Sequence, residues 1–175
     1  DHVTLSRPGR AFQMNAGAAA ARGEVLLFLH ADCRLVPGAL AAIAPALRRP
    51  GVVAGCFTMR VAADGWAYRS IDAAASARVR WTGIAYGDQG LFLTRRRFER
   101  LGGFPPLAFM EDVFFSRRLA RQGEVVVVSK RIFVSARRWQ KVGVARQTLL
   151  NWTLTALALA GTPPDRLAGF YPRVR

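Results

Sequence analysis

The stretch Glu24-Val-Leu-Leu-Phe-Leu-His-Ala-Asp32 decides the fold class of this chain. Its run of consecutive apolar residues, 25–29, predicts a strand covered on both faces, because an exposed strand face would alternate with polar positions. His30 and Asp32 then lie at the carboxyl end of the strand, which in an open α/β sheet is where ligands bind. Asp32 is therefore a candidate site residue, and a loop or helix-cap role is the alternative.

The composition indicates a globular chain of about one domain. Its 175 residues are 51% hydrophobic and 10% aromatic, which is enough to bury a full core. Cys33 and Cys56 show neither a CxxC nor a Cys/His ligand spacing, which argues against a zinc site or a disulfide framework. Residues 1–5 have no apolar leader pattern. We expect a cytoplasmic protein, with a peripheral contact at the inner membrane face as a further option.

The net charge of +15 is the strongest compositional bias. All basic residues except Lys130 and Lys141 are arginine in an Ala- and Gly-rich chain, so genome composition is one explanation. A solvated basic surface is one interpretation, and a surface that attracts the phosphates of nucleotides, anionic lipid or nucleic acid is the other. Because the basic residues are spread and no base-reading aromatic motif is present, we expect no nucleic-acid partner.

Helix and strand patterns alternate along the chain. Helices are predicted where apolar periodicity, Ala-rich composition or a first-turn proline is followed by a Gly or Pro stop. They cover residues 10–22, 37–48, 65–81, 95–100, 112–121 and 142–160, with a short helix after Pro163. Strands are predicted for residues 25–29, 51–61, 90–94, 124–129 and 132–135. This order predicts a mixed α/β domain over residues 1–140 and a helical extension, 141–175, packed on it.

The predicted helix 142–160 is the most apolar segment. Its stretch 148–160 is interrupted by Asn151, Thr153 and Thr155 and is too short to span a bilayer. With Trp152 it is suited to a membrane interface. Packing within the chain or in a homodimer is the alternative, which we favour.

Carboxylates that suit chemistry fall in three places. Asp32 follows a strand, Asp88 lies in Gly87-Asp88-Gln89, and the pair Glu111-Asp112 follows a proline loop. Carboxylates are hard ligands suited to Mg²⁺ or Mn²⁺, and Mg²⁺ takes one or two of them together with substrate phosphates. The pattern predicts a divalent cation and a general base. For Glu111-Asp112, favourable interaction with a helix dipole is the alternative.

The ordered set of motifs resembles family 2 glycosyltransferases, which have the GT-A fold. The resemblance is carried by Gln13-Met-Asn-Ala-Gly17, the stretch from Ala21 to Pro37, Gly87-Asp-Gln-Gly-Leu-Phe-Leu-Thr94, Leu101-Gly-Gly-Phe-Pro105 and Met110-Glu-Asp-Val113. The His30-Ala-Asp32 form, with Ser135-Ala-Arg-Arg-Trp139, is most similar to the bacterial subgroup known as radical-SAM/selenodomain-associated transferase 2. The resemblance implies a Rossmann-like, nucleotide-diphospho-sugar transferase fold over nearly the whole chain.

The resemblance also implies a reaction and its residues. A sugar would move from a UDP- or GDP-sugar to an acceptor hydroxyl by single displacement with inversion. Asp32 matches the metal-holding Asp of the family's Asp-x-Asp motif, and His30 replaces the first Asp, which touches the ribose. Asp112 matches the general base. Glu111 would orient the loop or the acceptor, and Asp88 and Gln89 match positions near sugar and acceptor.

Further matches concern the nucleotide and the acceptor. Arg10, Gln13 and Asn15 fall where relatives contact the nucleotide, and Arg10 suits a diphosphate clamp because its planar fork gives paired hydrogen bonds. A solvated arginine at a helix start is the alternative. Arg138 and Trp139 match the end of a Gln-x-x-Arg-Trp motif, where Trp139 would stack on a sugar or base ring.

The family's first strand, with its Pro-x-x-Asn-Glu end and the following base-reading loop, has no counterpart in this sequence. We therefore expect an N-terminally incomplete relative that is weakly active or inactive unless a partner strand replaces the missing one. The alternative from another class is a catalytically silent basic binding module for anionic lipid or nucleic acid, which the charge and the apolar helix with Trp152 favour.

Overall fold

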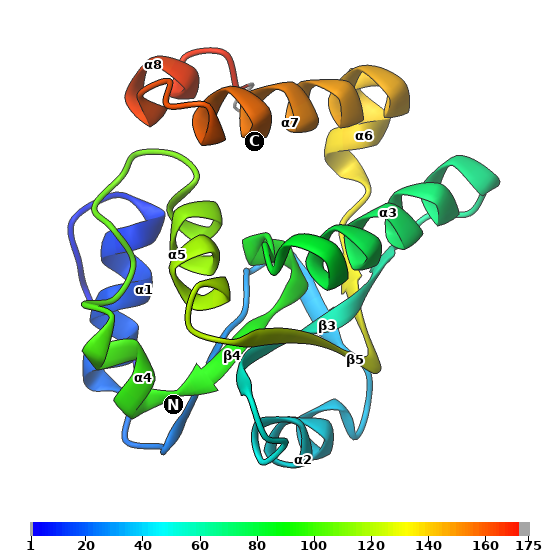
Figure 1. Cartoon of the computed structure of the whole chain (residues 1–175). Helices are drawn as coiled ribbons and strands as arrows, with labels where there is room; N and C mark the ends of the chain where they lie inside the picture. The colour runs from blue at the N-terminus through cyan, green and yellow to red at the C-terminus, as the bar shows by residue number, and fades with distance from the viewer. Residues whose placement is uncertain (1, 172–175) are drawn as a thin grey trace.

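The structure is a computed structural model that describes residues 2–171. Its centre is a five-stranded mixed sheet in the order β1-β4-β3-β5-β2 (Figure 1). The strands are β1 Val25–Phe28, β2 Cys33–Leu35, β3 Val52–Val61, β4 Leu91–Thr94 and β5 Glu124–Val134. β3 and β5 are parallel, and the other neighbouring pairs are antiparallel. The predicted mixed α/β architecture with flanking helices is confirmed.

The helices agree closely with the sequence pattern except near the C-terminus. They are α1 Arg10–Ala20, α2 Ile43–Leu47, α3 Trp66–Thr82, α4 Arg95–Arg100, α5 Glu111–Ala120, α6 Arg137–Val142, α7 Val144–Leu159 and α8 Pro164–Ala168. Two 3-10 turns, η1 Ala39–Ala42 and η2 Gly87–Gln89, complete the elements. The predicted helix 142–160 is observed as α7, which begins two residues later, and the helix α6 before it was not predicted. Gly143, with a φ of 95°, ends α6 and begins α7, and this left-handed geometry favours glycine.

Helices cover both faces of the sheet. In β3, Cys56 belongs to a core cluster with Val79 of α3, whereas its neighbour Phe57 belongs to a second cluster with Ile43 of α2. Successive side chains of a strand point to opposite faces, so this alternation shows that the centre of the sheet is covered on both sides. The apolar run in β3 reflects this burial.

The expectation that residues 25–29 are covered on both faces holds for the middle of the run and is wrong at its ends. Among the described residues β1 pairs with β4 alone, so it lies at an edge of the sheet. Leu26 and Phe28 are buried, but Val25 is 37% exposed and Leu29, which follows the strand, is 45% exposed. On the opposite face Leu27 is partly buried against the core cluster that contains Phe57, so the run is covered on both faces in its middle and exposed at its two ends.

Two further differences concern β5 and β2. The segments 124–129 and 132–135 form the single strand β5, because a register shift opposite Phe57 and Thr58 of β3 absorbs the polar residues between them. The strand β2, which the pattern did not predict, pairs with the end of β5. Asp32 thus lies in the turn between β1 and β2, immediately before β2.

An aromatic cluster holds the loop before α5. Phe28 of β1, Phe98 of α4, Phe104 in the loop and Phe115 of α5 have ring centroids 4.6 to 5.7 Å apart. Such offset and edge-on pairs add to the apolar burial. The cluster joins β1, α4 and α5, and so fixes where the carboxylates at the start of α5 are placed.

The C-terminal helices lie across one end of the sheet domain (Figure 1). Leu154 and Ala158 of α7 and Leu167 of α8 share a buried cluster with Met110 and Val113 at the start of α5. Residues 141–171 are therefore packed against the rest of the chain. Within the described part of the chain, no helix has both the length and the hydropathy needed to cross a membrane.

Asn15→Ala is expected to destabilise the fold. The Asn15 amide donates to the Phe104 carbonyl at 2.9 Å and accepts from the Phe104 N–H at 2.9 Å. The change leaves both backbone groups of a buried residue without partners, at a cost of about 2 kcal/mol. Urea unfolding measures the loss. Gln13→Ala, on the exposed side of the same helix, is the control, and equal losses in the two variants would contradict the prediction.

Candidate active site

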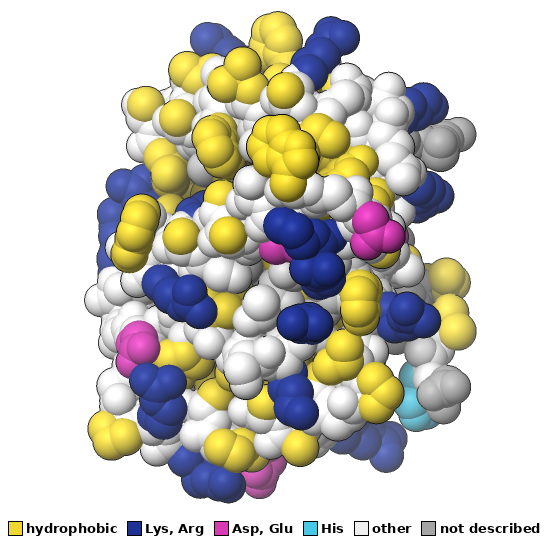
Figure 2. Space-filling model, turned by 90° about the vertical axis from the view of Figure 1, so that its right-hand side faces the viewer, with side chains coloured by type: hydrophobic (Ala, Val, Ile, Leu, Met, Phe, Trp, Pro, Cys, Tyr) yellow, Lys and Arg dark blue, Asp and Glu magenta, His cyan; other side chains and the backbone are white. Residues whose placement is uncertain are grey.

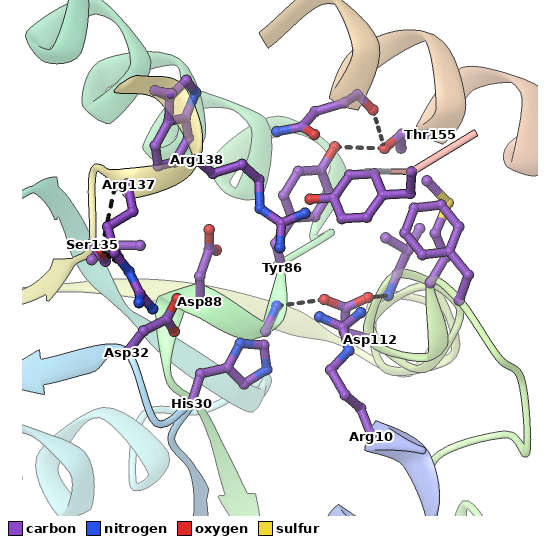
Figure 3. A pocket seen from close by; sticks show the side chains of 18 residues that line it. Arg10, His30, Asp32, Tyr86, Asp88, Asp112, Ser135, Arg137, Arg138 and Thr155 are labelled. Atoms are coloured by element: carbon purple, nitrogen blue, oxygen red, sulfur yellow. Dashed lines mark hydrogen bonds between the residues drawn. The ribbon is translucent and has the colours of Figure 1, made fainter. Parts of the chain in front are cut away.

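A pocket lies between the end of the sheet that carries His30 and the C-terminal helices (Figure 3). Its walls come from the β1–β2 turn, η2, the start of α5, the end of β5, α6 and α7. The predicted site residues that line it are Arg10, His30, Asp32, Asp88, Asp112, Arg138 and Trp139. Asp32 and Asp112, eighty positions apart in sequence, thus border the same cavity.

Asp112 is the most firmly held carboxylate of the pocket. It is 7% exposed, and its Oδ2 accepts a 2.6 Å hydrogen bond from the Gly87 N–H. Its Oδ1 accepts from the Val113 N–H at 2.8 Å, as is favourable in the first turn of a helix. The loop 104–110, which contains two prolines, ends at Met110 in the left-handed region with φ 61° and so turns the chain into α5.

Gly87 permits the close approach of three segments. A Cβ at this position would lie 2.4 Å from His30 Nε2 and 3.1 Å from Asp112 Oδ2. The backbone of η2 therefore fits between the β1–β2 turn and α5 only because residue 87 has no side chain. The spacing of His30, Gly87 and Asp112 depends on this contact.

Arg10 and Glu111 form an ion pair beside Asp112. The Arg10 Nε lies 2.8 Å from Glu111 Oε1, and its Nη2 donates to Oε2 at 3.3 Å. The Glu111 side chain is 1% exposed. Burial raises the pKa of Glu111 and the charge of Asp112 raises it further, whereas Arg10 opposes the shift. Arg10 lines the pocket, but its guanidinium is engaged by Glu111, a partner that the sequence did not indicate.

Asp88 presents an unsatisfied acceptor. Within residues 2–171, its Oδ1 and the Nε2 of His30 are enclosed and have no hydrogen-bond partner. Burial raises the pKa of the Asp88 carboxyl; Asp112 and Asp32 add to the shift, and Arg78 and His30 oppose it. A buried polar group without a hydrogen-bond partner costs free energy, so these two atoms are strained positions in the pocket wall.

These donors fit a divalent cation bound together with a phosphate substrate. Asp32 and Asp88 both line the pocket, and Asp32 is exposed to solvent. Among residues 2–171, no group of three or more His, Cys, Asp or Glu side chains has the arrangement of a complete metal cage. Mg²⁺ is commonly held by one or two carboxylates, with its remaining positions filled by water and substrate phosphates. The two carboxylates in the lining, the exposed Asp32 and the largely buried Asp88, match that number of protein ligands.

Four predicted residues lie outside the pocket lining. Gln13 is exposed on α1, Asn15 binds the Phe104 backbone, and Glu111 pairs with Arg10. Gln89 is fully buried behind the pocket, where its Oε1 accepts from Arg78 Nη2 at 2.5 Å and from the Tyr86 N–H at 3.3 Å. None of these four side chains is part of the pocket lining; Asn15, Glu111 and Gln89 hold neighbouring segments in place, and Gln13 is exposed to solvent.

A polar wall of the pocket, made mainly by α7, was not predicted from the sequence. Tyr86 OH and Thr155 Oγ1 are 2.7 Å apart, Thr155 donates to the Asn151 carbonyl, and the Asn151 side chain accepts from Gln147 at 2.7 Å. Tyr86, Asn151 and Thr155 line the pocket. Gln147, Asn151 and Thr155 follow one another at spacings of four residues. This spacing predicts that the three polar side chains share one face of an otherwise apolar helix.

Aromatic and basic groups close the pocket opposite the carboxylates. The Arg138 guanidinium of α6 lies 4.5 Å from the ring centroid of Tyr171, which follows α8 and also lines the pocket. Trp139, next to it, is 7% exposed. In Figure 3 the Arg138 side chain extends into the space above Asp88.

The fold and the pocket, with carboxylates gathered at one end of a mixed α/β sheet, define a GT-A type of protein. The model of glycosyl transferase family 2 matches residues 2–107, and the chain belongs to this family. No curated protein matches the sequence. The predicted family is thereby confirmed.

A solved structure has the same fold. A mannosyltransferase from Pyrobaculum calidifontis, in complex with GDP-Man and Mn²⁺, superposes with a TM-score of 0.60 at 21% sequence identity. The match covers 91% of this chain and 46% of that one, so the chain spans about half the length of its structural relative. The likeness supports the GT-A fold for this chain.

Asp88→Asn is expected to stabilise the protein more at neutral than at acidic pH. A folded-state pKa raised above the ordinary value means that the folded chain holds the proton more tightly, so stability falls as pH rises from about 4 toward the raised pKa. Asparagine has no titratable proton, so the variant does not lose stability in this way as the pH rises. Urea unfolding at pH 4 and pH 8 compares the variants, with the exposed Asp64→Asn as control. A difference from wild type that is the same at both pH values would contradict the prediction.

Proposed function

We propose that the chain is an inverting glycosyltransferase that moves a sugar from a nucleotide-diphosphate donor to an acceptor hydroxyl by single displacement. The proposal rests on one observation: Asp32, Asp88 and Asp112 line the same pocket in a chain of glycosyl transferase family 2. The motifs His30-Ala-Asp32 and Gly87-Asp-Gln89 support placement in the radical-SAM/selenodomain-associated transferase 2 subgroup.

The donor end of the pocket is proposed to lie at the β1–β2 turn. Asp32, with Asp88, would hold Mn²⁺ or Mg²⁺. The ion would supply positive charge to the diphosphate as it leaves the sugar. His30 lines the pocket beside this turn and is proposed to lie next to the nucleotide ribose. The GDP-Man and Mn²⁺ bound by the Pyrobaculum mannosyltransferase support testing GDP- and UDP-sugars first.

Asp112 is proposed as the general base. A carboxylate that faces the pocket and is fixed by two backbone N–H groups can accept the proton of an attacking hydroxyl without changing its position. The Glu111–Arg10 pair holds the turn on which Asp112 is placed. Arg10 can contact the diphosphate only by sharing its guanidinium with Glu111.

Single displacement is supported by the lack of an activated thiol. Burial, together with the charges of Asp88 and Asp32, raises the pKa of Cys33 far above its ordinary value, so this thiol beside the pocket stays protonated. The hydroxyl of Ser135 accepts hydrogen bonds from Arg137. Neither arrangement activates a nucleophile for a covalent intermediate.

The acceptor is proposed to bind against α6 and α7. The wall of Tyr86, Asn151 and Thr155 offers hydroxyl and amide groups, and Trp139 and Tyr171 offer ring surfaces. Arg138 and Asp88 lie between this wall and the proposed metal position (Figure 3). Polar side chains beside aromatic rings suit a hydroxylated acceptor.

A donor sugar with Mn²⁺ is expected to raise the melting temperature. Ligand at about 100-fold above Kd adds about 2.7 kcal/mol, which corresponds to about 5 to 10 °C in a domain of this size. Thermal unfolding with UDP- and GDP-sugars, with and without Mn²⁺, measures the shift. Asp32→Ala should abolish it, whereas the exposed Asp64→Ala should keep it. Equal shifts in these two variants would refute the metal position.

Asp112→Asn is expected to keep donor binding and to lose transfer. The amide keeps one oxygen for the Gly87 N–H, loses the acceptor for the Val113 N–H and cannot accept a proton, so turnover should fall by about 10²- to 10⁴-fold. Sugar transfer to simple acceptors measures the loss, and the Mn²⁺-dependent thermal shift with the donor reports binding. Transfer at the wild-type rate would exclude Asp112 as the base.

A further inference from the structure

The outer face of α7 is apolar and uncovered in the described structure. Ala145, Leu149, Trp152 and Ala156 follow one another at spacings of four, three and four residues and are all exposed, so they form one stripe along the helix. Leu149 is 65% exposed and Trp152 is 54% exposed. The opposite side of the helix carries the buried Leu154 and Ala158.

The charges on α6 and α7 all have one sign. No acidic residue occurs between Arg137 and Pro164. Lys141 and Arg146 are exposed at the start of α7, whereas α8 carries the exposed pair Asp165 and Arg166, whose charges cancel. Figure 2 shows this arrangement at the top of the molecule, where α6 and α7 lie in Figure 1. Hydrophobic side chains there have Lys and Arg on both sides, and Asp and Glu appear only lower down.

A second copy of the chain fits this face poorly. Sixteen residues of helix are about 24 Å long, and with a face about 10 Å wide they offer about 240 Å². A stable interface buries about 800 Å² on each partner. Pairing the face with itself would also bring the cations of both copies together, in a chain whose net charge is already +15.

We propose that the outer face of α7 docks on an anionic lipid surface. Trp152 and Leu149 would enter the boundary between headgroups and acyl chains, and Lys141 and Arg146 would meet the lipid phosphates. A helix with an apolar face, an interfacial Trp and basic residues at its end has the composition of such a contact.

Docking through the outer face of α7 would bring the pocket close to the lipid surface. Asn151 and Thr155 of the same helix line the pocket from its inner side, as Figure 3 shows for Thr155. An α-helix is about 10 Å thick. Docking therefore places the α7 wall of the pocket within about one helix diameter of the lipid headgroups. The docking itself does not depend on the proposed sugar transfer.

Sedimentation of the whole chain with lipid vesicles tests the proposal. The two vesicle types are phosphatidylcholine alone and phosphatidylcholine with one third phosphatidylglycerol. The wild type should bind the anionic vesicles at least tenfold more tightly, and this preference should fall with added salt. Leu149→Ser combined with Trp152→Ser should weaken the binding by about tenfold or more, because two apolar side chains no longer leave water.

Two further variants separate the contribution of the apolar side chains on α7 from that of exposed Trp in general and of the basic side chains. Trp81→Ser removes a Trp that is 86% exposed on α3, a different helix from α7, and should bind vesicles as the wild type does. Lys141→Gln with Arg146→Gln should weaken binding to anionic vesicles by about fivefold for each charge. The Leu149/Trp152 double variant should keep the donor-dependent thermal shift, so that loss of docking is distinguishable from loss of the active site.

Three results would overturn the proposal. The first is equal binding of the wild type to neutral and anionic vesicles, or none to either. The second is anionic binding that the Leu149/Trp152 double variant retains in full, since the arginine-rich surface alone would then explain it. The third is a wild-type dimer in light scattering that this double variant loses, which would assign the face to a second copy.

Discussion

The hydrogen bond from the Gly87 N–H to the Asp112 carboxylate is the contact on which the pocket depends. It joins two segments, η2 and the start of α5, that are 25 residues apart. Burying the adjacent acids Glu111 and Asp112 costs free energy, because a carboxylate loses its hydration and each charge repels the other. The backbone N–H groups on Asp112 and the Arg10 guanidinium on Glu111 offset this cost. The buried pair is stable only while both sets of partners remain in place.

The pocket keeps some of its polar groups unsatisfied. Burial raises the pKa of Asp88, and its Oδ1 has no hydrogen-bond partner within residues 2–171. His30 Nε2 is likewise enclosed and without a partner. Burying polar atoms in this way costs free energy. Their position beside the exposed Asp32 is consistent with a phosphate and cation site.

The C-terminal helices have two tasks in this architecture. The inner side of α7 closes the pocket through Asn151 and Thr155 and packs Leu154 against the start of α5. The outer side presents Leu149 and Trp152 to the surroundings. A single helix can do both because its polar, buried and exposed residues follow different faces of the 3.6-residue period. The break at Gly143 gives α7 its own direction, distinct from that of α6.

The sequence by itself determined the elements and the positions of the acids between them. Glycine and proline stops, the apolar runs of β3 and β4 and the motif order are local signals, so the helices α1 to α5, the family and the grouping of Asp32, Asp88 and Asp112 could be predicted. Tertiary structure alone decided the partners. The edge position of β1, the pairing of β2, the Arg10–Glu111 ion pair and the inward-turned amides of Asn15 and Gln89 all depend on contacts between distant segments. Arg10 and Glu111 are 101 positions apart, and Asn15 and Phe104 are 89 apart. No local periodicity records which of many arginines or amides will meet a given partner, because that choice is made only when the sheet and its helices pack together.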